Sequence, residues 1–254
     1  MGEDSEPVTA GLVIIGDEVL SGRTRDTNTG FLAAALNDMG IRVVEVRIVA
    51  DDNGAIIGAV NALRHSLDYV FTTGGIGPTH DDITAAAIAD AFSLTLVANE
   101  EGMARLQSHY GPGEFNEARK RMARTPKGAT LIDNPVSAAP GFQIENVFVM
   151  AGIPRIMKAM FEGIAHRLIG GAPLLSRTIS TGLGEGTLAD DLGRLQDAFA
   201  DVQIGSYPST SRARSGVRIV LRSVAAKRLD AAVGQVMEMV ARLGGDAKEL
   251  NINS

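Results

Sequence analysis

The sequence predicts an α/β fold, with a mostly parallel sheet sandwiched by helices, followed by a small α+β domain. Three observations support this prediction. Between Val8 and about Arg167, short apolar runs typical of strands alternate with helical patterns, as in successive βα units. Residues 170–173 (Gly-Gly-Ala-Pro) interrupt both periodicities, as a linker does. Beyond them the pattern is strand, helix, strand, strand, helix. We therefore place a large domain at 8–169 and a small one at 175–246.

The elements of the large domain follow one another along the chain, beginning with an apolar run that predicts the first strand. Short oxygen-bearing side chains at 26–28 (Asp-Thr-Asn) can cap the next helix, and Gly40 ends it. Alternating apolar and polar residues then predict a second strand. The later elements show either this alternation or apolar runs, which are typical of strands, or the three-to-four-residue apolar spacing of helices. The predicted strands are 12–15, 42–49, 69–72, 129–132 and 147–150, and the predicted helices are 29–39, 55–66, 83–92 and 154–168.

Three connecting segments stand out. Asp17 and Glu18 form a polar loop after the first strand. The charged segment 101–124 is helical in pattern but broken by Gly-Pro-Gly at 111–113, so we expect a helical excursion over the sheet. Residues 134–141 contain two prolines and a glycine, which predicts a loop between the last two strands.

The small domain reads as a βαββα unit, which suits a sandwich with the helices on one face of the sheet. A polar turn between its last two strands carries Arg212 and Arg214, which are either solvated charges or contacts to a phosphate. Its predicted strands are 178–181, 202–207 and 217–223, and its predicted helices are 187–200 and 230–243.

The bulk composition excludes several classes of protein. Hydrophobic residues make up 45% and charged residues 21%, as in an ordinary globular protein, and the net charge of -6 argues against a nucleic-acid or membrane partner. The absence of cysteine rules out disulfides and cysteine nucleophiles. The acidic residues 2–6 lack the apolar core of a signal peptide, and no apolar run is long enough to span a membrane. We expect a cytoplasmic protein.

The most informative stretch is 72–84, Thr-Thr-Gly-Gly-Ile-Gly-Pro-Thr-His-Asp-Asp-Ile-Thr, which joins a predicted strand to a predicted helix. Glycines let backbone N–H groups approach a ligand closely, and a helix start adds unpaired donors that attract phosphate. Asp81 and Asp82 would repel that phosphate unless a cation such as Mg²⁺ bridged them. The alternative is an ordinary turn in which one aspartate caps the helix.

Two further acidic pairs, Asp17-Glu18 and Asp51-Asp52, follow predicted parallel strands, at the edge where open α/β sheets bind ligands. Each pair alone could be a solvated loop, but together with Asp81-Asp82 they could surround one Mg²⁺. His80 is either an exposed loop residue or a contact to phosphate. The chain contains no P-loop, no dinucleotide fingerprint and no zinc spacing of its histidines.

These motifs resemble the signature of the molybdopterin-binding (MoaB/Mog-like) domain superfamily, and most closely the amino-terminal part of the CinA (competence/damage-inducible protein) family. The resemblance covers nearly the whole chain, including a small second domain of KH-like topology. It depends on 16–28, on 73–84 and on the third motif, 134–141. Two positions depart from the family pattern: Ser137 stands where glycine is usual, and Ala151 where proline is usual.

The resemblance implies phosphoryl-transfer chemistry. We expect a Mg²⁺-dependent hydrolase of pyrophosphate-linked nucleotides such as ADP-ribose or FAD, and the family likeness implies self-association as a homodimer. The alternatives are a molybdopterin adenylyltransferase-like enzyme of molybdenum cofactor biosynthesis and a non-catalytic nucleotide- or pterin-binding module. The expected catalytic residues are Asp82, Asp51 and Asp17, with Asp82 and Asp51 on the metal, and the expected substrate-binding residues are Gly74, Gly75, Gly77, Thr79, Thr84, Asn134 and Gly141.

Overall fold

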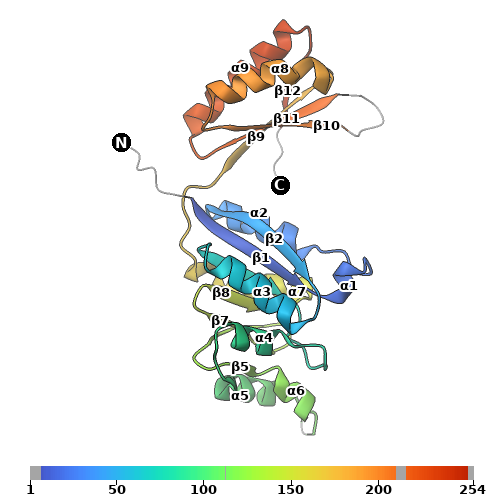
Figure 1. The fold of residues 1–254 in the computed structure, drawn as a ribbon, viewed down its shortest axis with the longest axis vertical. Helices are drawn as coiled ribbons and strands as arrows, with labels where there is room; N and C mark the ends of the chain where they lie inside the picture. The colour runs from blue at the N-terminus through green and yellow to red at the C-terminus, as the bar shows by residue number, and fades with distance from the viewer. Residues whose placement is uncertain (1–6, 112, 210–215, 251–254) are drawn as a thin grey trace. The chain divides into compact units, whose positions relative to one another are not determined.

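The computed structural model describes residues 7–111, 113–209 and 216–250. Contacts divide the chain into two compact units, and the division falls between Gly171 and Ala172 (Figure 1). The first unit has the predicted mostly parallel sheet with helices, and the second is a small α+β unit, so the predicted fold class is confirmed. Each unit is described below by itself.

The first unit is built on a six-stranded sheet in the order β2-β1-β3-β8-β7-β6, of which β1, β2, β7 and β8 are labelled in Figure 1. The first four strands in this order are mutually parallel, and the last two continue the sheet antiparallel. The strands are β1 (Val8–Ile15), β2 (Ile41–Val49), β3 (Tyr69–Thr73), β6 (Thr130–Ile132), β7 (Gly141–Ile144) and β8 (Val147–Met150).

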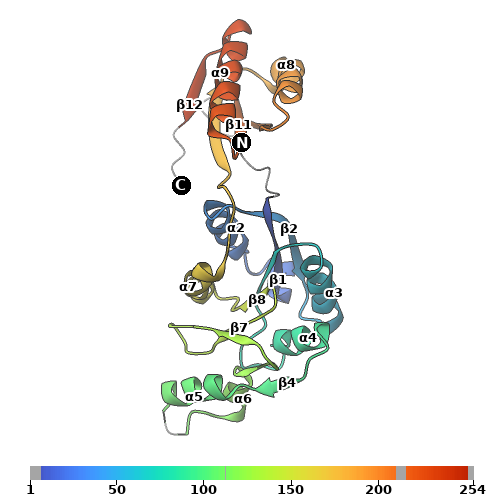
Figure 2. The ribbon, with the colours of Figure 1, turned by 90° about the vertical axis from the view of Figure 1, so that its left-hand side faces the viewer.

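Helices cover both faces of this sheet. One face carries α2 (Asn28–Asp38) and α7 (Pro154–Ile164), which a short 3-10 turn extends to Arg167, and the other carries α3 (Asn53–Arg64) and α4 (Thr84–Ala91) (Figure 2). Because both faces are buried, the central strands are continuous apolar runs. Phe71 of β3 is fully buried and stacks on Phe148 of β8, with 5.1 Å between the ring centroids.

The order of the strands creates a crevice at one edge of the sheet. From β1 the chain passes through α2 to β2 on one side, whereas from β2 it passes through α3 to β3 on the other side of β1. The connection that leaves β1 and the connection that leaves β3 therefore run in opposite directions, which opens a crevice between the carboxyl ends of these two strands. Open α/β sheets bind ligands at such a point.

The charged segment that follows α4 is the predicted helical excursion. It contains α5 (Glu100–His109) and α6 (Glu117–Arg121) and is closed by an antiparallel pair of strands, β4 (Leu96–Ala98) and β5 (Arg124–Pro126). The pair was not predicted, because three residues are too few to show a period. Arg105 of α5 forms ion pairs with Glu101 and Asp133, and this ties the excursion to the end of β6.

The second unit is a four-stranded antiparallel sheet in the order β10-β11-β9-β12, with two helices on one face. In β11, buried residues alternate with more exposed ones, as expected for a sheet covered on one side only. The turn that carries Arg212 and Arg214 lies outside the described residues. The elements are β9 (Leu175–Thr181), α8 (Glu185–Ala198), β10 (Gln203–Pro208), β11 (Val217–Ser223), α9 (Ala226–Arg242) and β12 (Ala247–Leu250).

Three details differ from the sequence-based expectations. Asp17 begins a one-turn helix, α1 (Asp17–Leu20), rather than a loop. The predicted loop 134–141 ends in an additional strand, β7, and the small unit has an additional strand, β12, so that its order is βαββαβ. Both added strands have only four residues, too few to separate from loop by pattern.

In the described part of the chain, no helix is long and apolar enough to cross a membrane.

The stacked core of the first unit yields a stability prediction. Truncating Phe71 to alanine removes a fully buried ring, so the free energy of unfolding should fall by about 3–5 kcal/mol. Urea denaturation followed by circular dichroism measures this loss. Val46→Ala, at a side chain that is 40% exposed on β2, is the control and should change stability far less. Equal losses in the two variants would contradict the assigned core.

Candidate functional site

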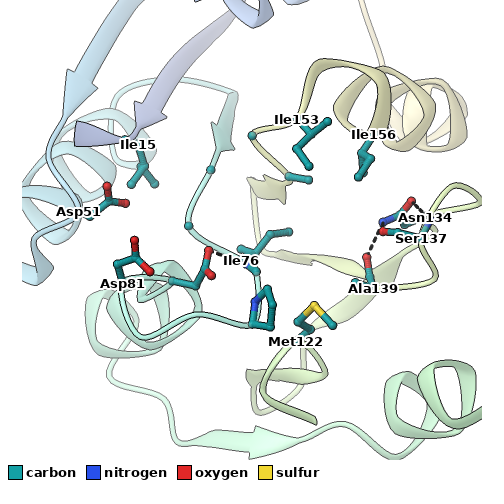
Figure 3. A pocket seen from close by; sticks show the side chains of 18 of the residues that line it. Ile15, Asp51, Ile76, Asp81, Met122, Asn134, Ser137, Ala139, Ile153 and Ile156 are labelled. Carbon is teal, nitrogen blue, oxygen red and sulfur yellow. Dashed lines mark hydrogen bonds between the residues drawn. The ribbon is translucent and has the colours of Figure 1, made fainter. Parts of the chain in front are cut away.

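A cleft of about 720 Å³ opens at the crevice between the strand ends (Figure 3). Its walls come from the segments after β1, β2, β3 and β8, from the loop after β6, and from the excursion. Six of the predicted site residues line it: Asp51, Gly74, Gly75, Gly77, Asp82 and Asn134. Such a volume suits a ligand the size of a nucleotide.

Glycines at the end of β3 allow the chain to pass through this crowded point. Gly74 has φ 110°, and a Cβ there would lie 2.1 Å from the carbonyl oxygen of Ile15. Gly75 has φ 65°, and a Cβ there would lie 2.2 Å from Oγ1 of Thr84. Any larger side chain would therefore displace the loop.

The backbone donors of this glycine loop are partly used within the protein. The N–H of Gly74 donates to the carbonyl of Met150 (3.1 Å), and that of Gly77 donates to Oδ1 of Asp82 (2.7 Å). Among the described residues, the N–H groups of Gly75 and Ile76 have no protein partner. Of the three glycines expected to bind phosphate, only Gly75 thus offers a free donor, and Ile76 adds another.

Asp82 organises the glycine loop. Its Oδ1 accepts from Gly77, and its Oδ2 accepts from the N–H of Thr79 (2.8 Å) and from the Thr79 hydroxyl. Both carboxylate oxygens are thus engaged in holding the turn, which differs from the expected role as the principal metal ligand. A carboxylate at this position stabilises the loop because charged acceptors form strong hydrogen bonds with backbone donors.

The two threonines expected to contact the substrate also hold the loop. Thr84 is fully buried, donates its hydroxyl to the carbonyl of Gly74 (3.0 Å) and donates its N–H to the carbonyl of Gly75 (3.0 Å). The Thr79 hydroxyl donates to Asp82. Neither threonine lines the cleft.

Carboxylates gather at one end of the cleft, which we call the acidic end and define as Glu18, Asp51 and Asp81. Figure 3 shows Asp51 and Asp81 at this end. Oδ2 of Asp51 accepts from the N–H of Asp17 (2.9 Å), and the Asp17 side chain lies beside this end. Burial raises the pKa of Asp51, and the negative charges of Asp17, Glu18 and Asp81 raise it further, whereas the bond from Asp17 partly offsets both effects.

The neighbours of these acids have other roles. Asp52 accepts from the N–H of Ala55 (2.9 Å) and caps α3. The His80 side chain is 96% exposed, with Nδ1 3.9 Å from Oδ1 of Asp81. Within the described residues, no group of three histidine, aspartate or glutamate side chains is placed to hold a metal ion by itself.

The third motif is a self-bonded loop. Asn134 is 7% exposed, and its Nδ2 donates to Oγ of Ser137 (2.7 Å) and to the carbonyl of Ala139 (2.8 Å). Its Oδ1 accepts from the N–H groups of Val136 and Ser137. Gly141 lies in β7, away from the cleft, where a Cβ would be 2.3 Å from the carbonyl oxygen of Val149.

Sequence reasoning missed the other end of the cleft. Ile76, Met122, Ile153 and Ile156 line it, and we call this set the apolar end (Figure 3). Tyr110 and Arg119 of the excursion also line the cleft. The apolar periodicity of α7 marks Ile156 as core, but no local pattern indicates that the excursion reaches this site.

Comparison with known proteins identifies the family. Residues 11–171 match the model of a probable molybdopterin binding domain, and residues 173–243 match the middle domain of FAD synthase. A CinA structure from Thermoplasma acidophilum has a TM-score of 0.61 and 30% identity, covering 64% of this chain and 99% of that chain.

Three related sequences have different lengths. A protein of Archaeoglobus fulgidus is 36% identical over 78% of this chain and 84% of its own length. A CinA-like protein of Salinibacter ruber is 33% identical over 93% of this chain, and a probable FAD synthase of Caenorhabditis elegans is 30% identical over 92%. The chain spans 60% and 50% of those two relatives. The chain belongs to the CinA family, and its first unit is a MoaB/Mog-like molybdopterin-binding domain.

Proposed function

We propose that this protein is an enzyme of nucleotide or cofactor metabolism, a Mg²⁺-dependent hydrolase that splits the pyrophosphate of ADP-ribose, FAD or a similar nucleotide. One observation carries the proposal: the free N–H groups of Gly75 and Ile76 and the acidic end lie in the same cleft. Backbone donors at a strand-to-helix turn bind phosphate oxygens. Neighbouring carboxylates would repel that phosphate unless a cation accompanied it.

The residues of the acidic end fit Mg²⁺. Both oxygens of Asp82 accept hydrogen bonds that hold the loop, and the other carboxylates that line the cleft are Glu18, Asp51 and Asp81, of which we assign Asp51 and Asp81 to the metal. Mg²⁺ is commonly held by one or two carboxylates together with substrate phosphates and waters, so a cage of three side chains is not required. When bound there, it would offset the charge on the leaving phosphate and orient a water.

The remaining groups position the substrate. Asp82 and Thr84 hold the loop in the conformation that leaves Gly75 and Ile76 free to donate. Among the described residues that line the cleft, no side chain is an obvious general base, and phosphoryl transfer can depend mainly on positioning and electrostatics. The matches to a FAD synthase middle domain and to a probable FAD synthase support a nucleotide substrate.

The match to a probable molybdopterin binding domain favours a second candidate, the transfer of adenylate to a pterin phosphate. Two incubations separate these candidates. With ATP, Mg²⁺ and molybdopterin the transferase yields an adenylylated pterin and pyrophosphate, whereas with ADP-ribose, Mg²⁺ and water the hydrolase yields AMP and ribose 5-phosphate. A non-catalytic binding module, which Ser137 and Ala151 left open, would bind without turnover in both assays.

Aspartate variants test the metal assignment. AMP release from ADP-ribose should require Mg²⁺ and stop with EDTA. Asp51→Asn should raise the Mg²⁺ concentration for half-maximal rate by about tenfold or more, because one ligand charge is lost. Asp82→Asn should instead lower the rate at every Mg²⁺ concentration, because the loop is held less well.

Asp52→Asn is the matched control, since Asp52 caps α3 and asparagine caps equally well. It should leave the Mg²⁺ dependence unchanged. The metal assignment is rejected if Asp51→Asn retains the wild-type Mg²⁺ dependence, and the hydrolase is rejected if the wild-type protein turns over neither ADP-ribose nor FAD.

The raised pKa of Asp51 predicts a stability effect without metal. A raised carboxyl pKa means that ionisation destabilises the folded state at pH values above that pKa. Asp51→Asn should therefore raise the melting temperature of EDTA-treated protein at pH 7, since the amide oxygen can still accept from Asp17. The gain should shrink as the pH falls through the raised pKa and vanish near pH ~4 or below. Thermal melts between these pH values measure it, and a lower melting temperature at pH 7 would contradict the prediction.

A further inference from the structure

The cleft is chemically divided along its length. The acidic end lies after β1 and β2 and in the glycine loop, whereas the apolar end lies between that loop, the excursion and the start of α7 (Figure 3). Phosphates account for a ligand near Gly75 and the carboxylates. Phosphates do not explain the apolar end, because a charged phosphate does not cover apolar side chains favourably.

Ile153 is the clearest sign that the apolar end is incomplete. Its side chain is 61% exposed at the start of α7, although Ile156 one turn later is 9% exposed. In Figure 3 the side chains of Ile153, which immediately precedes α7, and of Ile156 in α7 project toward the cleft, and Ile76 and Met122 lie on the opposite side. A large aliphatic side chain left in water inside a cleft gains free energy when a ligand covers it.

The excursion adds a planar pair to this cleft. The guanidinium of Arg119 stacks on the ring of Tyr110, with Cζ 4.0 Å from the centroid. Asn116 caps α6 through the N–H of Arg119 (3.0 Å), which fixes the start of that helix. Among the described residues that line the cleft, Arg119 is the only cationic side chain.

The excursion is itself held against the site. Arg105 of α5 pairs with Asp133, the residue before Asn134. Gly102 is buried, and a Cβ there would lie 3.2 Å from Cβ of Ala123 and 3.4 Å from Cγ of Pro140. Tyr110 and Arg119 are therefore carried by a segment that packs on the third motif.

We propose that the apolar end, with Tyr110 and Arg119, is the subsite for the flat heterocycle of the nucleotide whose phosphates lie at the glycine loop. The inference rests on the proposed function and extends it to the recognition of the base. Aliphatic side chains cover the faces of such a ring, and a tyrosine or guanidinium plane stacks on it. The phosphates and the base thus occupy opposite ends of one cleft.

Titration calorimetry of the 254-residue chain tests the subsite directly. The probes are AMP and FMN, which carry a heterocycle, and ribose 5-phosphate, which carries the same kind of phosphate without one, all with Mg²⁺. The wild-type protein should bind AMP or FMN more tightly than ribose 5-phosphate. Ile153→Ala should weaken the tighter heterocyclic probe by about fivefold or more and leave ribose 5-phosphate unchanged.

Matched variants separate recognition from general damage. Ile169→Ala removes an isoleucine that is 78% exposed away from the cleft, and should leave all three affinities unchanged. Tyr110→Ala should weaken the heterocyclic probe by about fivefold or more, and Tyr110→Phe should restore it, because the stacking ring is kept.

The possible outcomes are distinct. Equal binding of all three probes by the wild-type protein overturns the subsite, as does equal weakening of all three by Ile153→Ala. Base-selective binding that depends on Ile153 and Tyr110 supports it even if neither ADP-ribose nor FAD is hydrolysed. In that last case the proposed hydrolase fails and the subsite stands.

Discussion

The site depends on how closely three segments of chain approach one another at the end of β3. Gly74 leaves no room for a side chain beside the carbonyl of Ile15, and a Cβ on Gly152 would lie 3.2 Å from Cα of Gly74. The ends of β1 and β3 and the turn after β8 are therefore packed backbone to backbone. Packing of this kind fixes the path of the glycine loop before any side chain acts, because displacement of one segment requires displacement of the others.

The conspicuous polar residues around this point make hydrogen bonds that hold the loops around the cleft. Asp82 and Thr84 bind the glycine loop, and Asn134 binds the third motif through four hydrogen bonds. The carboxylates of the acidic end, which we assign to the metal, lie in a less favourable electrostatic environment. Asp51 is partly buried among like charges, and its raised pKa records the resulting cost to the folded state. The ionised form of Asp51 therefore destabilises the folded protein at the place where we expect a cation, and such destabilisation is common at functional sites.

Much of the fold could be predicted because its main elements are long and periodic, such as β2, α3 and α9. The short strands β4, β5, β7 and β12 could not, since three or four residues carry no period. The glycine loop was predicted from its composition, but the hydrogen bonds that occupy Asp82 depend on the turn geometry. Tyr110 and Arg119 reach the cleft only through tertiary contacts such as Arg105 with Asp133, which no local pattern encodes.

The arrangement couples a cation to the phosphates. Within the described residues, the carboxylates of the acidic end form no group that holds a metal ion by itself, and their charge repels a phosphate that approaches Gly75. The cation and the phosphate each favour binding of the other. The cation would neutralise the charges of Asp51 and Asp81 that repel the phosphate, and the phosphate would supply further oxygen ligands to the cation. Binding free energies are reciprocal, so any gain in phosphate affinity from the cation equals the gain in cation affinity from the phosphate. A base held at the apolar end would add affinity that depends on neither charge.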